Sequence, residues 1–208
     1  MSTAQKYWDK SAKKYAQSPV ADEATYQRKL EETQSFLKEH MRVLEFGCGT
    51  GTTALAHAAH VAAIDAIDIS QAMIDICQEK AEAAGVGNVH FKRATLTEFA
   101  ADASTYDAVL GLNVLHLLPN RREAIRETAR VLKSGGLFVT STVCLAGSSL
   151  RFLRPLVPIG KLFGLLPDVF VLSEAELVQE LEAEGFTIER QWHHAKDGIA
   201  VFIIARKQ

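Results

Sequence analysis

The stretch Val43-Leu44-Glu45-Phe46-Gly47-Cys48-Gly49-Thr50-Gly51 decides the fold of this chain. A short apolar run that ends in an acid indicates a buried strand, and glycines on alternate positions indicate a turn into a helix that begins near Thr52. Glycine adopts a positive φ without strain, and it lets backbone N–H groups approach a bound molecule where a Cβ would collide. The stretch is therefore predicted to be a cofactor-binding loop.

The spacing of the glycines separates the cofactors that such a loop can bind. A dinucleotide fingerprint requires G-x-G-x-x-G, but here the third glycine comes one residue early and Thr52 occupies the sixth position. A phosphate-binding P-loop requires Gly-Lys-Ser/Thr, and no lysine follows this loop. Glu45 would place a carboxylate beside the phosphates in either case. An acid at this position favours a cofactor that carries positive charge.

Length and composition indicate one globular domain over residues 1–208. Of the 208 residues 48% are hydrophobic and 23% charged, and the net charge of −2 gives no basic field for nucleic acid. Cys48, Cys77 and Cys144 are isolated, which argues against disulfides and a zinc site and predicts a reducing, cytoplasmic location. We expect no signal peptide and no stable membrane insertion, because no apolar run is long enough.

Apolar runs alternate with amphipathic stretches along most of the chain. Repeated β-α-β units predict a parallel sheet covered by helices on both faces, followed by a C-terminal hairpin. The predicted strands are 42–46, 63–67, 89–93, 106–112, 137–143, 186–193 and 199–205. The predicted helices are 52–59, 70–84, 120–132 and 174–184, and residues 5–40 are helix-prone.

Several polar residues are predicted to begin these helices, and glycines to end them. Ser70 is expected to cap its helix, Asn120 has the cap-to-N3 spacing with Glu123, and Ser173-Glu174-Ala175-Glu176 has the form of a capping box. Gly85 and Gly135 stand where helix ends favour a left-handed residue.

The pattern E-x-G-x-G-x-G closely resembles the first motif of class I S-adenosylmethionine (SAM)-dependent methyltransferases, and the order of elements resembles their fold. The resemblance covers about residues 5–206 and points to small-molecule enzymes of the ubiquinone-pathway C-methyltransferase type. It implies an α/β, doubly wound, Rossmann-like seven-stranded sheet with a C-terminal antiparallel hairpin and a small helical cap. The implied cofactor, S-adenosyl-L-methionine, carries an ammonium and a sulfonium, which suits Glu45.

The resemblance assigns cofactor contacts to the ends of the first two strands. Glu45, Gly47, Cys48 and Gly49 would bind the cofactor at the first loop. Asp68 would accept hydrogen bonds from the ribose hydroxyls, although enzymes that use NAD place an acid at the same position. In the phrase Asp-Ile-Ser-x-x-Met, Ile69 and Met73 would flank the adenosine, and a core position is the alternative for Met73. Asp65 is expected to face elsewhere.

The third and fourth strands also end in candidate contacts. Ala94-Thr95-Leu96 stands where many relatives carry Gly-Asp-Ala, so Thr95 would bond the adenine without a charge, and the backbone N–H groups of Thr95 and Leu96 are the substitutes. Asn113 would lie beside the cofactor. His116 is the candidate general base, or else a residue that orients the strand end.

The N-terminal segment 1–40 is expected to fold over the cofactor as a helical cap. Tyr15 and Tyr26 would pack on the cofactor or bond its carboxylate, and Arg28 would pair with that carboxylate. The alternative is that these aromatic residues only anchor a helix. The other histidines are weaker site candidates. His57 and His60 are expected on a solvated helix face, because no third metal ligand is evident. His193 and His194 are expected to point to opposite faces of one strand, so they cannot both serve one site.

Residues 144–172 are predicted to form the substrate cap. They are apolar and interrupted by Pro and Gly, which favours a partly hydrophobic small molecule, unless the cap merely closes on itself. Arg151, Arg154 and Lys161 would recognise an acid or an anionic membrane surface.

The expected reaction is in-line methyl transfer to an O, N or C acceptor, with no metal and with a homodimer left open. The alternatives are a SAM-binding, non-catalytic subunit and an NAD-dependent oxidoreductase.

Overall fold

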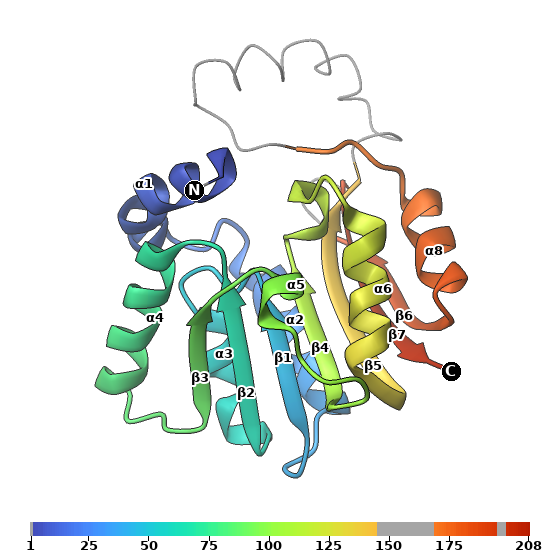
Figure 1. The fold of residues 1–208 in the computed structure, drawn as a ribbon, viewed down its shortest axis with the longest axis horizontal. Coiled ribbons are helices and arrows are strands. Elements are labelled where there is room, and N and C mark those ends of the chain that lie inside the picture. Colours follow the sequence, from blue (N-terminus) through green and yellow to red (C-terminus); the bar gives the residue numbers. More distant parts are fainter. Residues whose placement is uncertain (1, 145–168, 195–198) are drawn as a thin grey trace.

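The computed structural model describes residues 2–144, 169–194 and 199–208. These residues form a seven-stranded sheet in the order β3-β2-β1-β4-β5-β7-β6 (Figure 1). Strands β1 to β5 run parallel, whereas β7 pairs antiparallel with both β5 and β6. The strands are β1 (Arg42–Phe46), β2 (Ala63–Asp68), β3 (Val89–Arg93), β4 (Tyr106–Leu112), β5 (Leu132–Val143), β6 (Phe186–His193) and β7 (Ala200–Lys207).

Helices cover both faces of this sheet (Figure 1). Buried residues of α6 and α8 share one apolar cluster with one face of the sheet, and those of α3 and α4 share a second cluster with the other face. The helices are α1 (Thr3–Gln17), α2 (Glu23–Phe36), α3 (Thr52–His57), η1 (Ala58–His60), α4 (Gln71–Ala83), α5 (Leu96–Phe99), η2 (Leu115–Leu117), α6 (Arg121–Val131) and α8 (Glu174–Ala183). The predicted doubly wound α/β fold with a C-terminal antiparallel hairpin is confirmed.

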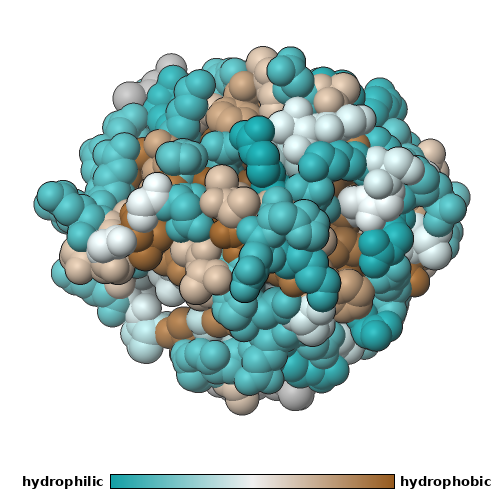
Figure 2. Space-filling model, turned by 90° about the horizontal axis from the view of Figure 1, so that it is seen from below, coloured by the Kyte–Doolittle hydropathy of each residue, from teal (hydrophilic) through white to brown (hydrophobic). Residues whose placement is uncertain are grey.

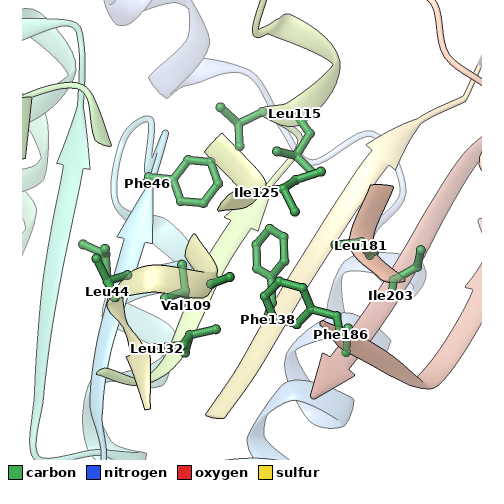
Figure 3. Packing of buried hydrophobic residues seen from close by; sticks show 14 of the residues in the cluster. Leu44, Phe46, Val109, Leu115, Ile125, Leu132, Phe138, Leu181, Phe186 and Ile203 are labelled. Atoms are coloured by element: carbon green, nitrogen blue, oxygen red, sulfur yellow. The ribbon is translucent and has the colours of Figure 1, made fainter. Parts of the chain in front are cut away.

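Three phenylalanines from different strands form the centre of the larger cluster (Figure 3). The ring of Phe138 on β5 lies 6.2 Å from that of Phe46 and 5.7 Å from that of Phe186. Ile125 of α6 and Leu181 of α8 are fully buried in the same cluster. Because Phe46 is the last residue of β1, this packing fixes the position at which the glycine loop begins.

The strand predictions hold to within two residues at each end, with one exception. Strand β5 begins at Leu132, whereas the sequence pattern predicts residue 137. Leu132 pairs with Tyr106, but the register then shifts so that Leu137 pairs with Ala108. The intervening Gly135 has φ +75°, so the early part of β5 is a bulge that an apolar pattern does not reveal.

The predicted helix caps have different outcomes. The Ser70 Oγ accepts the N–H of Met73 at 3.2 Å, as expected. Ser173 forms the predicted capping box at α8. Asn120 stands at the N-cap position of α6, as predicted, but its side chain accepts no helix N–H and its amide donates instead to Glu123 Oε2 at 3.3 Å.

The prediction for His57 is also wrong. Its side chain is fully buried in the described structure, and neither ring nitrogen has a hydrogen-bond partner there. Burial, assisted by His60, lowers the pKa of His57 to about 4, so the ring is neutral at physiological pH. Only His60 lies on the exposed face that the helical pattern predicts for both residues.

The parallel strands end at the upper edge of the sheet in Figure 1, where α1 lies beside α4. The chain reverses its direction of winding between β1 and β4, and in open α/β sheets ligands bind at such a switch point. The opposite edge is mainly hydrophilic, with apolar residues scattered across it (Figure 2). No helix among the described residues is long and apolar enough to cross a membrane.

Candidate cofactor-binding and active site

A cavity of about 1030 Å³ lies at the carboxyl edge of the sheet. Residues of α1 and α2 and of the segments after β1, β2, β3 and β4 line it. With the exceptions of Arg28 and His116, every residue predicted for the site lies on this lining: Tyr15, Tyr26, Glu45, Gly47, Cys48, Gly49, Asp68, Ile69, Met73, Ala94, Thr95, Leu96 and Asn113. The structure thus brings together residues from six separate segments of the chain.

The three glycines of the loop have left-handed backbones for different reasons. Their φ angles are +65° at Gly47, +54° at Gly49 and +74° at Gly51. A Cβ at Gly47 would lie 2.6 Å from Val114 Cγ2, and one at Gly51 would lie 2.9 Å from Cys77 Sγ. A Cβ at Gly49 meets nothing closer than 3.8 Å. The outer glycines are therefore required by the packing of the protein itself, while the central glycine leaves open backbone at the cavity.

Glu45 is the most unusual group in the cavity. Its side chain is only 3% exposed, and its Oε2 atom has no hydrogen-bond partner in the described structure. Burial, reinforced by the charge of Asp68, raises the pKa of the carboxyl to about 8. An unpaired buried carboxyl of this kind gains a strong interaction when a cationic group enters the cavity beside it.

Asp68, the last residue of β2, connects the first two loops. Its Oδ2 accepts the N–H of Gly49 at 3.0 Å, and its Oδ1 accepts the N–H of Ser70 at 2.9 Å. Burial raises the pKa of the carboxyl, and these two hydrogen bonds oppose that shift. A carboxylate has about four lone-pair sites, so the side chain can still accept two ligand hydroxyls. Asp65 faces elsewhere, as expected, and accepts from Tyr106 Oη at 2.8 Å.

Apolar side chains complete the wall next to Asp68. Met73 is 1% exposed and also lines the cavity, so its core and ligand-facing roles are compatible. Ile69 lies on the same wall. Cys48 is buried against Cys77, and a hydrogen bond between the two thiols together with burial raises the pKa of Cys48 well above its usual value. The Cys48 thiol is thus protonated and acts as a small apolar group.

Thr95 has a second role that the sequence analysis missed. Its Oγ1 accepts the N–H of Glu98 at 3.1 Å, and its own N–H donates to Glu98 Oε2 at 2.9 Å. This capping box, signalled by the Thr-x-x-Glu spacing, occupies the Thr95 N–H, which therefore cannot substitute for the missing acid. The hydroxyl proton of Thr95 and the N–H of Leu96 remain as donors at this end of the cavity.

The N-terminal helices close the cavity from outside. Asp9 of α1 accepts the Ser70 hydroxyl at 2.6 Å and the N–H of Ala72 at 3.3 Å, which ties α1 to the start of α4. Tyr15 and Tyr26 line the cavity, and Tyr26 Oη lies 3.5 Å from Thr53 Oγ1.

Arg28 and Lys29 point in different directions. The Arg28 guanidinium bonds Glu32 at 3.0 Å and stacks 3.9 Å from the centre of the Trp192 ring, away from the cavity lining. Lys29 lines the cavity, is 8% exposed and makes no side-chain hydrogen bond or ion pair in the described structure. Burial lowers the pKa of its amine, which Asp22 partly offsets. Lys29 lies three residues after Tyr26 and so shares its helix face, which is the one weak signal for it in the sequence.

Asn113 follows β4 with a φ of +56°, a conformation that asparagine tolerates better than most residues. Two hydrogen bonds hold it against Ser141 of β5. The Asn113 N–H donates to the Ser141 carbonyl at 2.7 Å, and the Ser141 hydroxyl donates to Asn113 Oδ1 at 3.1 Å. Ser141 Oγ also lies 3.2 Å from Nε2 of His194, which lines the cavity.

His116 is buried outside the cavity lining. Its Nδ1 accepts the N–H of Val143 at 3.5 Å, and its carbonyl accepts the N–H of Phe170 at 2.7 Å. Burial lowers the pKa of its ring to about 4. These contacts orient the ends of neighbouring segments. Of the predicted substrate cap at 144–172, residues 145–168, including Arg151, Arg154 and Lys161, lie outside the described residues.

Comparison with known proteins agrees with this geometry. Residues 43–136 match the methyltransferase domain family. The chain is 31% identical over 132 residues to the uncharacterized methyltransferase YcgJ of Bacillus subtilis, which covers 64% of this chain and 52% of YcgJ. It is 26% identical over 151 residues to ubiquinone biosynthesis O-methyltransferase of Coxiella burnetii. This alignment covers 70% of this chain and 63% of that protein. The chain thus spans between half and two thirds of the length of these relatives.

Solved structures show the same fold. The crystal structure of YcgJ superposes with a TM-score of 0.73 at 20% identity, over 88% of this chain and 99% of that one. A second similar structure is geranyl diphosphate C-methyltransferase from Streptomyces coelicolor, solved with Mg²⁺, geranyl diphosphate and S-adenosyl-L-homocysteine. It superposes with a TM-score of 0.74 at 16% identity, over 89% of this chain and 79% of that one. Residues 43–136 thus match the methyltransferase domain family, and the fold of the chain is that of solved methyltransferases.

Proposed function

We propose that this chain binds SAM and transfers its methyl group to a partly hydrophobic small molecule. The unpartnered, buried carboxyl of Glu45 beside the glycine loop carries the proposal, because it fits a cofactor with positive charge. A dinucleotide would instead place phosphates near this acid.

The residues along the carboxyl edge fit the parts of SAM in one order. Thr95 and Leu96, after β3, would donate to the adenine, and Asp68, after β2, would accept from the ribose hydroxyls. The loop after β1 would hold the amino-acid part, with Glu45 near its cationic groups and Lys29 near its carboxylate. That Arg28 also pairs with this carboxylate stays a prediction. This order follows the strand order β3-β2-β1, which leaves the side of β4 and β5 for the methyl acceptor.

SAM, when bound, supplies a methyl group on a positively charged sulfur, which is already a good leaving group. The main task of the chain is then to hold the acceptor in line with that group. Alignment of two reactants accounts for about 7–11 kcal/mol of a barrier. Residues 1–40 would exclude water as the cofactor cap, and 144–172 would cover the acceptor.

The acceptor side is mainly apolar, which supports a partly hydrophobic substrate. Its described lining residues include Leu112, Val114, Leu117, Leu118 and Pro119. Ubiquinone biosynthesis O-methyltransferase is named for an oxygen acceptor and geranyl diphosphate C-methyltransferase for a carbon acceptor, so the acceptor atom depends on side chains particular to this chain. The free thiols support a reducing, cytoplasmic location.

Calorimetric titration with SAM and with NAD tests the cofactor. We expect SAM to bind and NAD not to bind, and the reverse result contradicts the proposal. Incubation with radiolabelled SAM and a small-molecule extract of cells then tests the reaction, with labelled product as the expected result. SAM binding without transfer to any extracted molecule would instead indicate a non-catalytic, SAM-binding subunit.

A further inference from the structure

Helix α4 donates to two consecutive carbonyls of the glycine loop. The Cys77 thiol donates to the Gly49 carbonyl at 3.1 Å. The Lys80 ammonium donates to the Thr50 carbonyl at 3.1 Å. Resting on the proposed binding of SAM, we propose that Cys77 and Lys80 are positioning residues, which turn the N–H of Thr50 toward the carboxylate of the cofactor. The sequence motifs assign neither side chain to the site.

The direction of the Gly49 carbonyl fixes the direction of the next N–H group. In a planar trans peptide the C=O and the N–H point in opposite directions, and no cis peptide bond occurs among the described residues. Because the Gly49 carbonyl is turned to α4, the N–H of Thr50 is turned away from α4. Gly49 and Thr50 both line the cavity, so this N–H is available to a bound molecule.

The N–H groups on either side of Thr50 are already bonded within the protein. The N–H of Gly49 donates to Asp68 Oδ2 at 3.0 Å. The N–H of Gly51 donates to the Cys48 carbonyl at 3.0 Å. Thr50 is only 6% exposed, and its own N–H makes no hydrogen bond in the described structure. Such a donor is costly until an acceptor reaches it, and the acceptors in the amino-acid part of SAM are its carboxylate oxygens.

Lys80 uses all of its donors on the loop. Its ammonium lies 3.1 Å from the Thr50 carbonyl, 3.2 Å from Thr50 Oγ1 and 3.1 Å from Thr52 Oγ1. An ammonium has three donors, and each of these partners is an oxygen without formal charge. No acid among the described residues therefore neutralises the charge of Lys80. The side chain also lines the cavity, where that charge attracts a carboxylate.

Packing holds the Cys77 thiol against the same loop. The side chain is fully buried, and a Cβ at Gly51 would lie only 2.9 Å from its Sγ. Cys77 and Lys80 are three residues apart on α4, so they lie on one face of the helix. The two side chains thus form one clamp, which fixes the loop before the cofactor arrives.

Nuclear magnetic resonance tests the contact on the wild type. We expect the amide proton signal of Thr50 to move downfield when SAM binds, because the N–H gains a charged acceptor. Decarboxylated SAM lacks that acceptor and should leave the signal close to its position in the free protein. A Thr50 signal that does not move with SAM, or that moves equally with both compounds, overturns the contact.

The role of Lys80 is tested by Lys80→Met, with Gln78→Met as the matched control on the exposed side of the same helix. We expect Lys80→Met to weaken SAM binding about tenfold or more in calorimetry, the effect of a lost hydrogen bond to a charged group. Gln78→Met should stay within about twofold of the wild type. No loss in Lys80→Met, or an equal loss in the control, overturns the role of Lys80.

The role of Cys77 is tested by a pair of variants at one position. Cys77→Ser keeps a donor and Cys77→Ala removes it, so Cys77→Ser should bind SAM about fivefold more tightly than Cys77→Ala. A merely structural role predicts the opposite order, because a buried hydroxyl without a required partner is tolerated less well than a methyl group. Equal affinities, or tighter binding by Cys77→Ala, overturn the role of Cys77. If these variants do not fold, the Thr50 signal of the wild type still decides the contact.

These outcomes separate the inference from the proposed function. If the wild type binds SAM while the Thr50 signal stays unchanged, only this inference fails. If the wild type binds NAD and not SAM, the proposed function fails and the inference fails with it.

Discussion

The carboxylate of Asp68 accepts the backbone N–H of Gly49 across 3.0 Å, which joins the end of β2 to the glycine loop after β1. Asp68→Ala removes this bond and the acceptor proposed for the ribose. Because a hydrogen bond to a charged group contributes about 1.5–3 kcal/mol, we expect SAM affinity to fall about 10- to 100-fold, measured by calorimetry.

Asp65→Asn is the matched control on the same strand. Asp65 bonds Tyr106 and Arg42 away from the cavity, so this variant should leave SAM affinity unchanged. An equal loss in both variants would mean that Asp68 acts through the stability of β2 and not through the ligand.

Much of the fold is predictable from the sequence because buried parallel strands appear as apolar runs and helices as amphipathic ones. The glycine loop and Asp68 are predictable because their spacing along the chain is short and fixed. Lys29 and His194 are harder to predict, since each reaches the cavity through the packing of its element. His57 shows the same limit: helical periodicity places it with His60, but only the packed structure shows that it is buried.

The outer glycines of the loop should be sensitive to any side chain. Gly47→Ala introduces a Cβ that would lie 2.6 Å from Val114 Cγ2, on a backbone with φ +65°. We expect a loss of about 2–4 kcal/mol in the free energy of unfolding, from strain and overpacking together, measured by urea denaturation. The double variant Gly47→Ala/Val114→Ala should recover part of that loss. Unchanged stability of the single variant would show that the loop is not held in this conformation.

Glu45 should make the wild type less stable at higher pH. Its pKa is about 8 in the folded chain and about 4.5 in the unfolded chain. Between these values the folded state holds a proton that the unfolded state has released, so the free energy of unfolding falls as pH rises from about 4.5 to about 8. Glu45→Gln removes this contribution, about 3–5 kcal/mol across the range. The free energy of unfolding of Glu45→Gln should therefore exceed that of the wild type by a margin that grows as pH rises from about 4.5 to about 8. A constant difference across this range would contradict the raised pKa of Glu45.

The same carboxyl should couple SAM binding to proton release. A cationic group beside Glu45 favours its ionised form, so at pH 7 binding should expel the proton that the free protein holds. SAM affinity should rise by up to about tenfold per pH unit between pH 6 and 8. Calorimetry in buffers with different ionisation enthalpies measures the release directly.

Glu45→Gln serves as the reference for that measurement. An α-amino group such as that of SAM itself titrates near pH 8, and this contribution is common to both proteins. Only the difference between them reports Glu45. Equal proton release in the two proteins would mean that the carboxyl does not respond to the cofactor.

Lys29 and Arg28 give opposite predictions for variants one residue apart. Lys29→Met should raise the melting temperature, because it removes a buried amine without a partner in the described structure, yet weaken SAM binding about tenfold or more. Arg28→Met should cost less than about 1 kcal/mol in stability, since it removes only a stacking contact with Trp192 and an exposed ion pair with Glu32. Its SAM affinity should match that of the wild type. If Arg28→Met weakens binding while Lys29→Met does not, the residue predicted from the sequence holds the cofactor's carboxylate and Lys29 does not.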